Sequence, residues 1–313
     1  MNVLIEVAIS MVGLYIIFSI VNSALVEGYA QFINKRGNFL KESLDNFFKD
    51  PVNSEINLAE ELYNHKLVRA FMEKNKVLPS WIDPKIFTQA FMELVFKDTH
   101  TAGAKFTGEL REGAKEKLPG DLDKTLQFIL NKATEEEGIN MGKVQEEIEG
   151  LYDSYMVRVS EWYKKKMKYL LMGAGIALAF VLNLDSINFY TALKNDGELR
   201  REQVQISKNL YDNQSEIRSK LNALKDSVEV KSFDLDEVQQ SLDNVVAQVL
   251  SKEQAENFEN NLSELKIGIH QFRKGKKTTE DYMWGIFGVC LTGFALSFGS
   301  TFWFGLLKKL VGK

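Results

Sequence analysis

The apolar residues of this 313-residue chain are gathered into three blocks, and this distribution limits the fold more than any other feature. The blocks cover residues 3–26, 167–184 and 282–307, and the segments between them are rich in Lys, Glu, Asp and Asn. A bilayer core of about 30 Å is crossed by about 20 helical residues, and residues 3–24 alone supply that length. We therefore expect a membrane protein with three transmembrane helices.

The first block is predicted to be a retained helix and not a cleaved signal peptide. The chain begins MNVLIEV, with an acid and no base before the apolar core, whereas a signal peptide begins with a positive region. The formal net charge of -4 does not indicate a nucleic-acid partner. The single cysteine, Cys290, lies inside the third block, so no intramolecular disulfide is expected.

The side of the membrane is predicted from the lysines that precede the second block. Trp162 and Tyr163, which favour the headgroup layer, are followed at once by Lys164, Lys165 and Lys166. Positive residues beside a span are enriched on the cytoplasmic face, so these lysines predict that the segment before the second block is cytoplasmic. The inverted orientation stays open because of a second basic cluster on the outer segment, at Arg273, Lys274, Lys276 and Lys277.

This orientation divides the chain into six parts and places the N-terminus outside and the C-terminus inside. They are transmembrane helix 1 (1–26), a cytoplasmic helical domain (27–166), transmembrane helix 2 (167–185), an extracytoplasmic segment (186–281), transmembrane helix 3 (282–307) and a cytoplasmic tail (308–313).

Helical spacing of apolar residues recurs in both polar segments, and no strand pattern stands out. Residues 25–48 continue the first block as an amphipathic helix, with Gly37 as a candidate bend, and residues 144–168 run into the second block. In the outer segment we predict a helical hairpin, with one arm marked by Leu199, Ile206, Leu210, Ile217 and Leu224 and the other covering residues 235–265. Residues 78–85, which contain Pro79 and Pro84, predict a turn before a short apolar helix over residues 86–96. Residues 99–120 are glycine-rich and predict a loop. The expected fold is all-α.

Four stretches of the chain carry recognisable motifs. They are "VAISMVGLYIIFSIVNSALVEGYAQFINKRGNFL", "LYNHKLVRAF" with "LPSWIDPKIFTQAFMELV", "YDSYMVRVSEWYKKK" with "LAFVLNLDSI", and "TGFALSFGSTFWFGLLKKL". Together they resemble an uncharacterised family of bacterial multi-span membrane proteins with a Ser-x3-Ser-x3-Glu stripe and "HPL", "PSYIP", "RVSGWYKR", "NVD" and "GAPFWFDLLNKL"-like motifs.

The residues at the matching places are Ser19, Ser23, Glu27, His65, Pro79, Ser80, Arg158, Trp162, Tyr163, Lys164, Asn183, Asp185, Phe302, Trp303 and Phe304. The chain departs from the pattern at Lys66, Glu161 and Gly305, where the family has proline, glycine and aspartate. The resemblance implies a multi-pass protein of the bacterial plasma (inner) membrane and brings no known reaction with it.

Three residues of the first block form the candidate intramembrane polar stripe. Ser19, Ser23 and Glu27 are spaced by four and so share one face of a helix. An ionisable side chain at membrane depth is a functional hypothesis by default. The favoured interpretation is structural, with serines that permit close helix packing and a glutamate that reaches the headgroups near Arg36. Glu6 and Asp185 are interpreted as solvated ends of spans, or as partners of a basic residue in the outer segment.

No catalytic, cofactor or metal site is predicted. His65, His100 and His270 lie far apart, without carboxylates or cysteines at metal-ligand spacing, and His65 is interpreted as structural. The sequence contains no phosphate-binding glycine loop and no nucleophile motif. We therefore expect a non-enzymatic protein.

Small residues in the second and third blocks are the candidate helix-packing positions. They are Gly173, Ala177, Gly288, Thr292 and Gly299, and small side chains let transmembrane helices approach closely. The interfacial anchors are Trp162, Tyr163, Lys164, Lys165, Lys166, Phe302, Trp303 and Phe304.

These features predict a homo-oligomeric scaffold that presents helical domains on both membrane faces, with lipid, itself and another protein as partners and no nucleic acid. The alternative is a pore or channel, including a membrane-disrupting defence effector, in which the polar stripe lines water. Stoichiometry, partner and process are not determined by the sequence.

Overall fold

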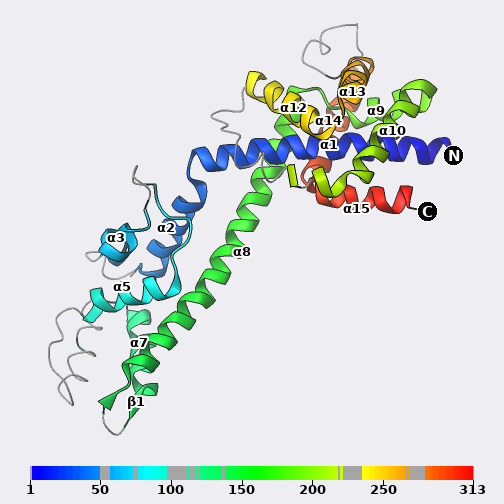
Figure 1. Cartoon of the computed structure of the whole chain (residues 1–313). Coiled ribbons are helices and arrows are strands. Elements are labelled where there is room, and N and C mark those ends of the chain that lie inside the picture. The colour runs from blue at the N-terminus through cyan, green and yellow to red at the C-terminus, as the bar shows by residue number, and fades with distance from the viewer. Residues whose placement is uncertain are drawn as a thin grey trace. The chain divides into compact units, whose positions relative to one another are not determined.

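The computed structural model describes residues 2–49, 57–72, 77–96, 112, 118, 120–135, 138–217, 219–220, 235–265, 267 and 279–312 (Figure 1). Within these residues the chain is helical apart from loops and one pair of two-residue strands. The all-α prediction is therefore confirmed. The second basic cluster, His100, His270 and nearly all of the predicted 99–120 loop lie outside the described residues.

The chain folds as two compact units. The bundle unit comprises residues 1–33 and 166–313, and the insert unit comprises residues 34–165. Each unit has a hydrophobic core of its own.

The insert unit is built around an aromatic core. Its elements are α2 (Lys35–Phe47), α3 (Leu58–Asn64), α4 (Lys66–Arg69), α5 (Pro84–Phe96), α7 (Gly120–Lys132), the antiparallel strands β1 (Thr134–Glu135) and β2 (Gly138–Ile139), and the first part of α8 (Met141–Val181). The rings of Phe87 and Tyr152 stack at 3.9 Å, and Phe91 stacks on Phe87. The Tyr152 hydroxyl donates to the Ile82 carbonyl, so this buried polar group is satisfied. The predicted turn before Pro84 is confirmed, because α5 starts at that proline.

A break separates α1 (Val3–Phe32) from α2, but it does not lie at Gly37. Asn34 adopts a left-handed conformation (φ 44°), which ends the continuous helix that the periodicity predicted. Gly37 has another role, because a Cβ there would lie 2.4 Å from the Leu78 carbonyl oxygen. Its missing side chain lets the Leu78 backbone approach α2.

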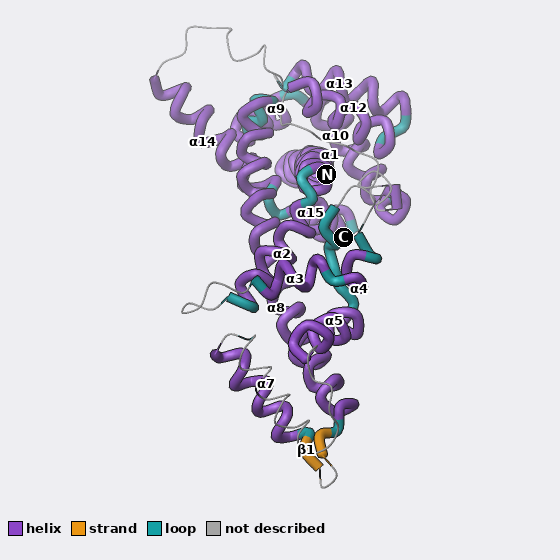
Figure 2. Tube along the Cα trace, turned by 90° about the vertical axis from the view of Figure 1, so that its left-hand side faces the viewer, coloured by secondary structure: helices purple, strands orange, loops and turns teal. Residues whose placement is uncertain are grey.

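The bundle unit is organised around α1. The helices that follow the second apolar block are α9 (Ser186–Asn195), α10 (Gly197–Asp212), α12 (Leu235–Val249), α13 (Lys252–Glu264), α14 (Thr279–Leu296) and α15 (Gly299–Val311). Figure 2 looks along α1 and shows these helices arranged around it. A helix that is apolar on all sides needs a core or a membrane around it. Here protein surrounds it, since no residue from 6 to 30 is exposed.

The outer segment contains more helices than the predicted hairpin. Its first arm is α9 and α10, and its second arm is divided between α12 and α13 by a capping box at Ser251. The predicted apolar seam is confirmed at Leu199, Ile206, Leu210 and Ile217, which are all buried. Because α10 and α12 pack on α1, the outer segment covers the first apolar block.

The second apolar block ends in a bend set by two polar residues. Asn183 is left-handed (φ 53°), and the Leu184 amide donates to the Ala179 carbonyl, as in a Schellman motif. Asp185 then caps α9 by accepting from the amides of Ile187 and Asn188. The axis turns by 55° between α8 and α9.

The third apolar block is not one straight helix. It divides into α14 and α15, which are bent by 94°, with Gly299 left-handed (φ 74°) at the start of α15. The Trp303 indole donates to the Ala295 carbonyl across the bend. By length and composition α1 could cross a membrane alone, whereas the second and third blocks qualify only as bent pairs.

Candidate functional site

Three hydroxyl side chains from three helices meet inside the bundle unit. The Tyr15 hydroxyl lies 2.7 Å from the Ser186 Oγ, which lies 2.7 Å from the Thr292 Oγ1. Thr292 also accepts from the Ser186 amide and donates to the Gly288 carbonyl. All three side chains are buried, so the network joins α1, the start of α9 and α14 away from water. We call these three residues the hydroxyl network.

The predicted polar stripe runs from the interior of the bundle toward its surface. Ser19 is fully buried and donates to the Leu296 carbonyl at 3.5 Å, and Ser23 donates back to the Ser19 carbonyl of its own helix. Glu27 is half-buried. The two serines thus bond to backbone carbonyls within the protein.

Asn22 is a buried polar residue that the sequence analysis missed. Its amide nitrogen donates to the Leu171 carbonyl of α8 at 3.1 Å, while its Oδ1 has no hydrogen-bond partner among the described residues. An asparagine inside an apolar block, three residues after Ser19, was the available signal. Burying an amide whose oxygen has no hydrogen bond costs free energy. The bond from Asn22 to the Leu171 carbonyl is therefore a contact between α1 and α8 that stabilises the fold.

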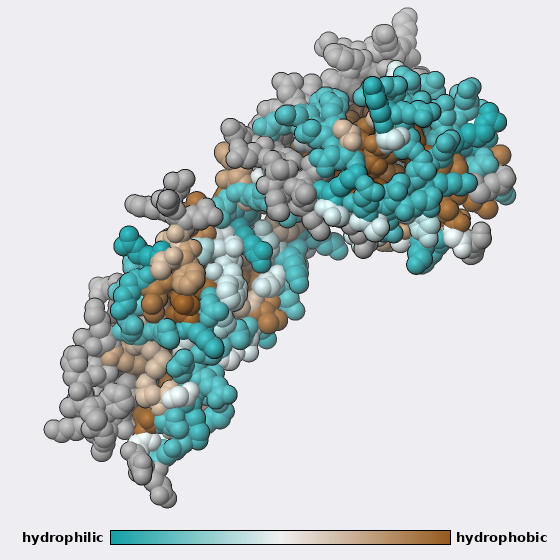
Figure 3. Space-filling view, viewed as in Figure 1, coloured by the Kyte–Doolittle hydropathy of each residue, from teal (hydrophilic) through white to brown (hydrophobic). Residues whose placement is uncertain are grey.

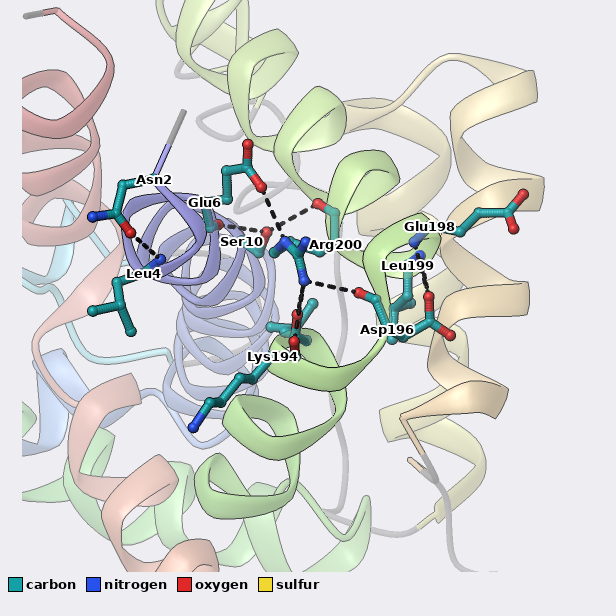
Figure 4. Close-up of polar contacts among 10 residues, drawn as sticks. Asn2, Leu4, Glu6, Ser10, Lys194, Asp196, Glu198, Leu199 and Arg200 are labelled. Carbon is teal, nitrogen blue, oxygen red and sulfur yellow. Dashed lines mark hydrogen bonds and ion pairs between the residues drawn. The ribbon is translucent and has the colours of Figure 1, made fainter.

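A partly buried ion pair joins α1 to the outer segment (Figure 4). Arg200 Nε donates to Glu6 Oε2 at 3.0 Å, and the two side chains are only 13% and 20% exposed. Arg200 Nη1 also donates to the carbonyls of Leu193, Lys194 and Asp196 around the end of α9. The alternative in which Glu6 pairs with a basic residue of the outer segment is confirmed, and the solvated interpretation of Glu6 was wrong.

The predicted packing positions have different surroundings. Gly288 faces the Asp185 carboxylate, because a Cβ there would lie 1.9 Å from Asp185 Oδ1, and Thr292 belongs to the hydroxyl network. Gly299 has no described atom within 4 Å of a Cβ built there, and its left-handed backbone forms the turn between α14 and α15. Gly173 and Ala177 are exposed on α8, and nothing lies within 4 Å of a Cβ built at Gly173.

A close crossing of α8 and α14 involves two glycines that were not singled out from the sequence. A Cβ at Gly293 would lie 2.6 Å from the Ile176 Cα, and a Cβ at Gly175 would lie 2.9 Å from the Gly293 carbonyl oxygen. Only glycine allows α8 and α14 to approach this closely. Small residues are frequent in both blocks, so spacing alone did not identify this pair.

The predicted interfacial anchors divide between surface and core. Trp162 and Phe302 are exposed, as are Lys164, Lys165 and Lys166, whereas Trp303 and Phe304 are buried. Tyr163 packs on Phe39 at 5.6 Å, with the Arg36 guanidinium 6.0 Å from its ring centre. The Trp303 ring lies 4.6 Å from that of Tyr15, so it contacts α1 inside the bundle.

His65 lies in the insert unit beside an acid and a base. Its Nε2 is 3.2 Å from Glu93 Oε2, which Lys66 Nζ contacts at the same distance. Hydrogen bonding from Lys66, helped by His65, holds the pKa of the exposed Glu93 carboxyl below its ordinary value. His65 Nδ1 accepts from the Leu67 amide and caps α4, which supports the structural interpretation of this histidine.

The described polar groups are arranged to join helices. Among the described residues no group of three His, Cys, Asp or Glu side chains could hold a metal ion. Comparisons with protein-family models, with curated proteins and with solved structures found no match for this chain.

Proposed function

We propose that this chain is a non-enzymatic, multi-pass membrane scaffold of the bacterial plasma membrane that assembles with copies of itself and presents helical units to partner proteins. The observation that carries the proposal is the outward face of α14, which exposes apolar side chains to the outside of the bundle. These are Met283, Trp284, Ile286, Phe287, Leu291 and Phe294, each between 44% and 68% exposed. Exposed apolar surface of this kind is typical of a lipid or protein contact.

A scaffold role is supported by how the polar side chains are used. The hydroxyl network and the Glu6–Arg200 pair each join elements distant in sequence. Such contacts rigidify a bundle and need no substrate.

The small residues of α8 support self-association more strongly than those of α14. Gly288 and Thr292, which suggested contacts between copies, are occupied by contacts within one chain. Gly173 and Ala177, one helical turn apart, remain on the surface of α8. Small residues at this spacing let helices of two copies approach closely in a membrane.

The lysine cluster at Lys164–Lys166 still supports a cytoplasmic insert unit and an N-terminus outside. For the C-terminus the geometry supports the outside as well, against the expectation from the sequence. Ser19 contacts Leu296 and Tyr15 contacts Trp303, so α15 runs antiparallel to α1. Figure 1 shows the two chain ends at the same end of α1.

The pore alternative has weaker support. Its lining would be Ser19, Ser23 and Glu27, but both serines bond to carbonyls inside the bundle. A water-filled path along this stripe would require the bundle to open.

The test uses the full chain in three measurements. We expect bacterial membranes to retain it after alkaline carbonate washing, mass photometry in mild detergent to give a multiple of the 35.7 kDa chain, and protein-containing vesicles to pass no ions. Release by carbonate would contradict the membrane assignment, a monomeric mass would contradict self-association, and ion flux would favour the pore.

A further inference from the structure

The most apolar helix of the chain is enclosed by protein. Residues 6–30 of α1 contain no exposed side chain, and α9, α10, α12, α14 and α15 all pack on it. Phe18 adds a ring contact with Phe258 of α13 at 6.3 Å. Hydropathy alone would place this helix in lipid, but little of its surface is available to lipid.

Two of the helices that pack against α1, α10 and α13, have polar outer faces. The exposed residues of α10 are Glu198, Arg201, Gln205, Lys208 and Asp212, and those of α13 are all polar as well. Over α10 the surface is mostly hydrophilic in the view of Figure 3. Charged side chains in the hydrocarbon core are costly, so these faces belong in water or in the headgroup layer.

The outer face of α14 has the opposite character. Every exposed residue from Met283 to Phe294 is apolar, and no Asp, Glu, Lys or Arg occurs between Asp281 and Lys308. The surface continues over the bend, where Phe298 contacts Phe294 at 5.1 Å and Phe302 at 4.8 Å. All three of these phenylalanines are exposed.

We infer that the outer face of α14, continued by Phe298 and Phe302, is the surface that meets lipid acyl chains, whereas α1 and the α15 residues packed on it are shielded from lipid. This inference rests on the proposed membrane function and specifies where that membrane contact lies.

The lack of charge on the outer face of α14 and the length of this face favour lipid, and not a partner protein, as its contact. A protein partner is usually met by an apolar centre with a polar rim, whereas every exposed residue that the structure describes on α14 from Met283 to Phe294 is apolar. The apolar part of α14, Met283–Leu296, is about 21 Å long, most of the roughly 30 Å of a bilayer core. Acidic residues precede the face and Lys308 and Lys309 follow it, so charge lies only beyond its two ends.

The two tryptophans of the third block allow a direct test. Trp284 lies on the proposed lipid face and is 63% exposed, whereas Trp303 is 8% exposed and contacts Tyr15 of α1. Two full-length variants are compared, Trp81→Phe/Trp162→Phe and the same with Trp284→Phe, so the buried Trp303 stays intact in both. Each is reconstituted into phosphatidylcholine vesicles with and without bromine atoms on the acyl chains, and vesicle flotation is measured in parallel.

We expect brominated lipid to remove the part of the emission that depends on Trp284 and to leave the emission of Trp303 nearly unchanged. Equal quenching of both would place α15 in lipid and overturn the inference. Flotation without quenching of Trp284 would show that protein, such as a second copy, covers the face. Failure to float with vesicles would instead contradict the proposed membrane function itself.

Discussion

At the scale of single residues, Arg200 is the side chain on which most contacts converge. It pairs with Glu6 and donates to three carbonyls, with only 13% of its side chain exposed. Removing one partner of a fully buried pair typically costs about 3–5 kcal/mol, and this partly buried pair should lie at the low end, at about 3 kcal/mol. We expect Arg200→Met to lower the free energy of unfolding by about this amount, measured by thermal unfolding in detergent. The double variant Glu6→Gln/Arg200→Met should lose less than Arg200→Met alone, and a larger loss would show that the pair is not coupled.

Glu93 provides a residue-scale prediction of pH dependence. Its pKa is held below the ordinary value of 4.5, chiefly by the hydrogen bond from Lys66. A carboxyl with a lowered pKa in the folded state stabilises the fold above its unfolded pKa, and this contribution is lost as the pH falls through the folded value. We expect Lys66→Met to raise the Glu93 pKa toward 4.5 in an NMR titration, with Lys124→Met as the control. An unchanged Glu93 pKa would contradict the Lys66 contact.

At the scale of elements, the bend between α14 and α15 depends on Gly299. A left-handed conformation costs a residue with a Cβ about 1–2 kcal/mol. We expect Gly299→Ala to lower the melting temperature. Gly305→Ala is the matched control, since Gly305 lies exposed within α15 with open space around it and alanine favours helix. If both variants melt alike, the left-handed turn is not required.

The α8–α14 crossing distinguishes contacts within a chain from contacts between chains. Gly293→Leu forces a side chain against the Ile176 backbone, so we expect loss of folded protein. A Cβ at Gly173 has no described atom within 4 Å, so we expect Gly173→Leu to fold normally and to self-associate more weakly. Yield of monodisperse protein and mass photometry measure the two effects. Reversed outcomes would assign Gly293 to the contact between copies.

At the scale of the whole molecule, the arrangement of the bundle predicts which segments share a side of the membrane. Single cysteines at Asp153, Asn213 and Gly312 in a Cys290→Ser background are treated in intact cells with an impermeant maleimide. We expect labelling of Asn213→Cys and Gly312→Cys and protection of Asp153→Cys. Gly312→Cys tests the path of α15, because a straight third span would protect it. Labelling of Asp153→Cys alone would establish the inverted orientation.

The sequence alone was sufficient to predict the helical class, the continuous helix through residues 144–168, the buried seam of α10 and the start of α5. These features follow from local periodicity and from proline and capping chemistry, which act within a few residues. It also contained the signals for the bend after Val181, where Asn183 and Asp185 end one helix and begin the next.

Three features became evident only from the packing of the helices: what covers α1, where the third block bends and which small residues are close packed. Hydropathy measures the preference of a helix for an apolar environment and does not distinguish lipid from the apolar faces of α10 and α12. The pairing of Glu6 with Arg200 was left open for a related reason. The two residues are 194 positions apart, and such a contact depends on how the whole bundle closes around α1.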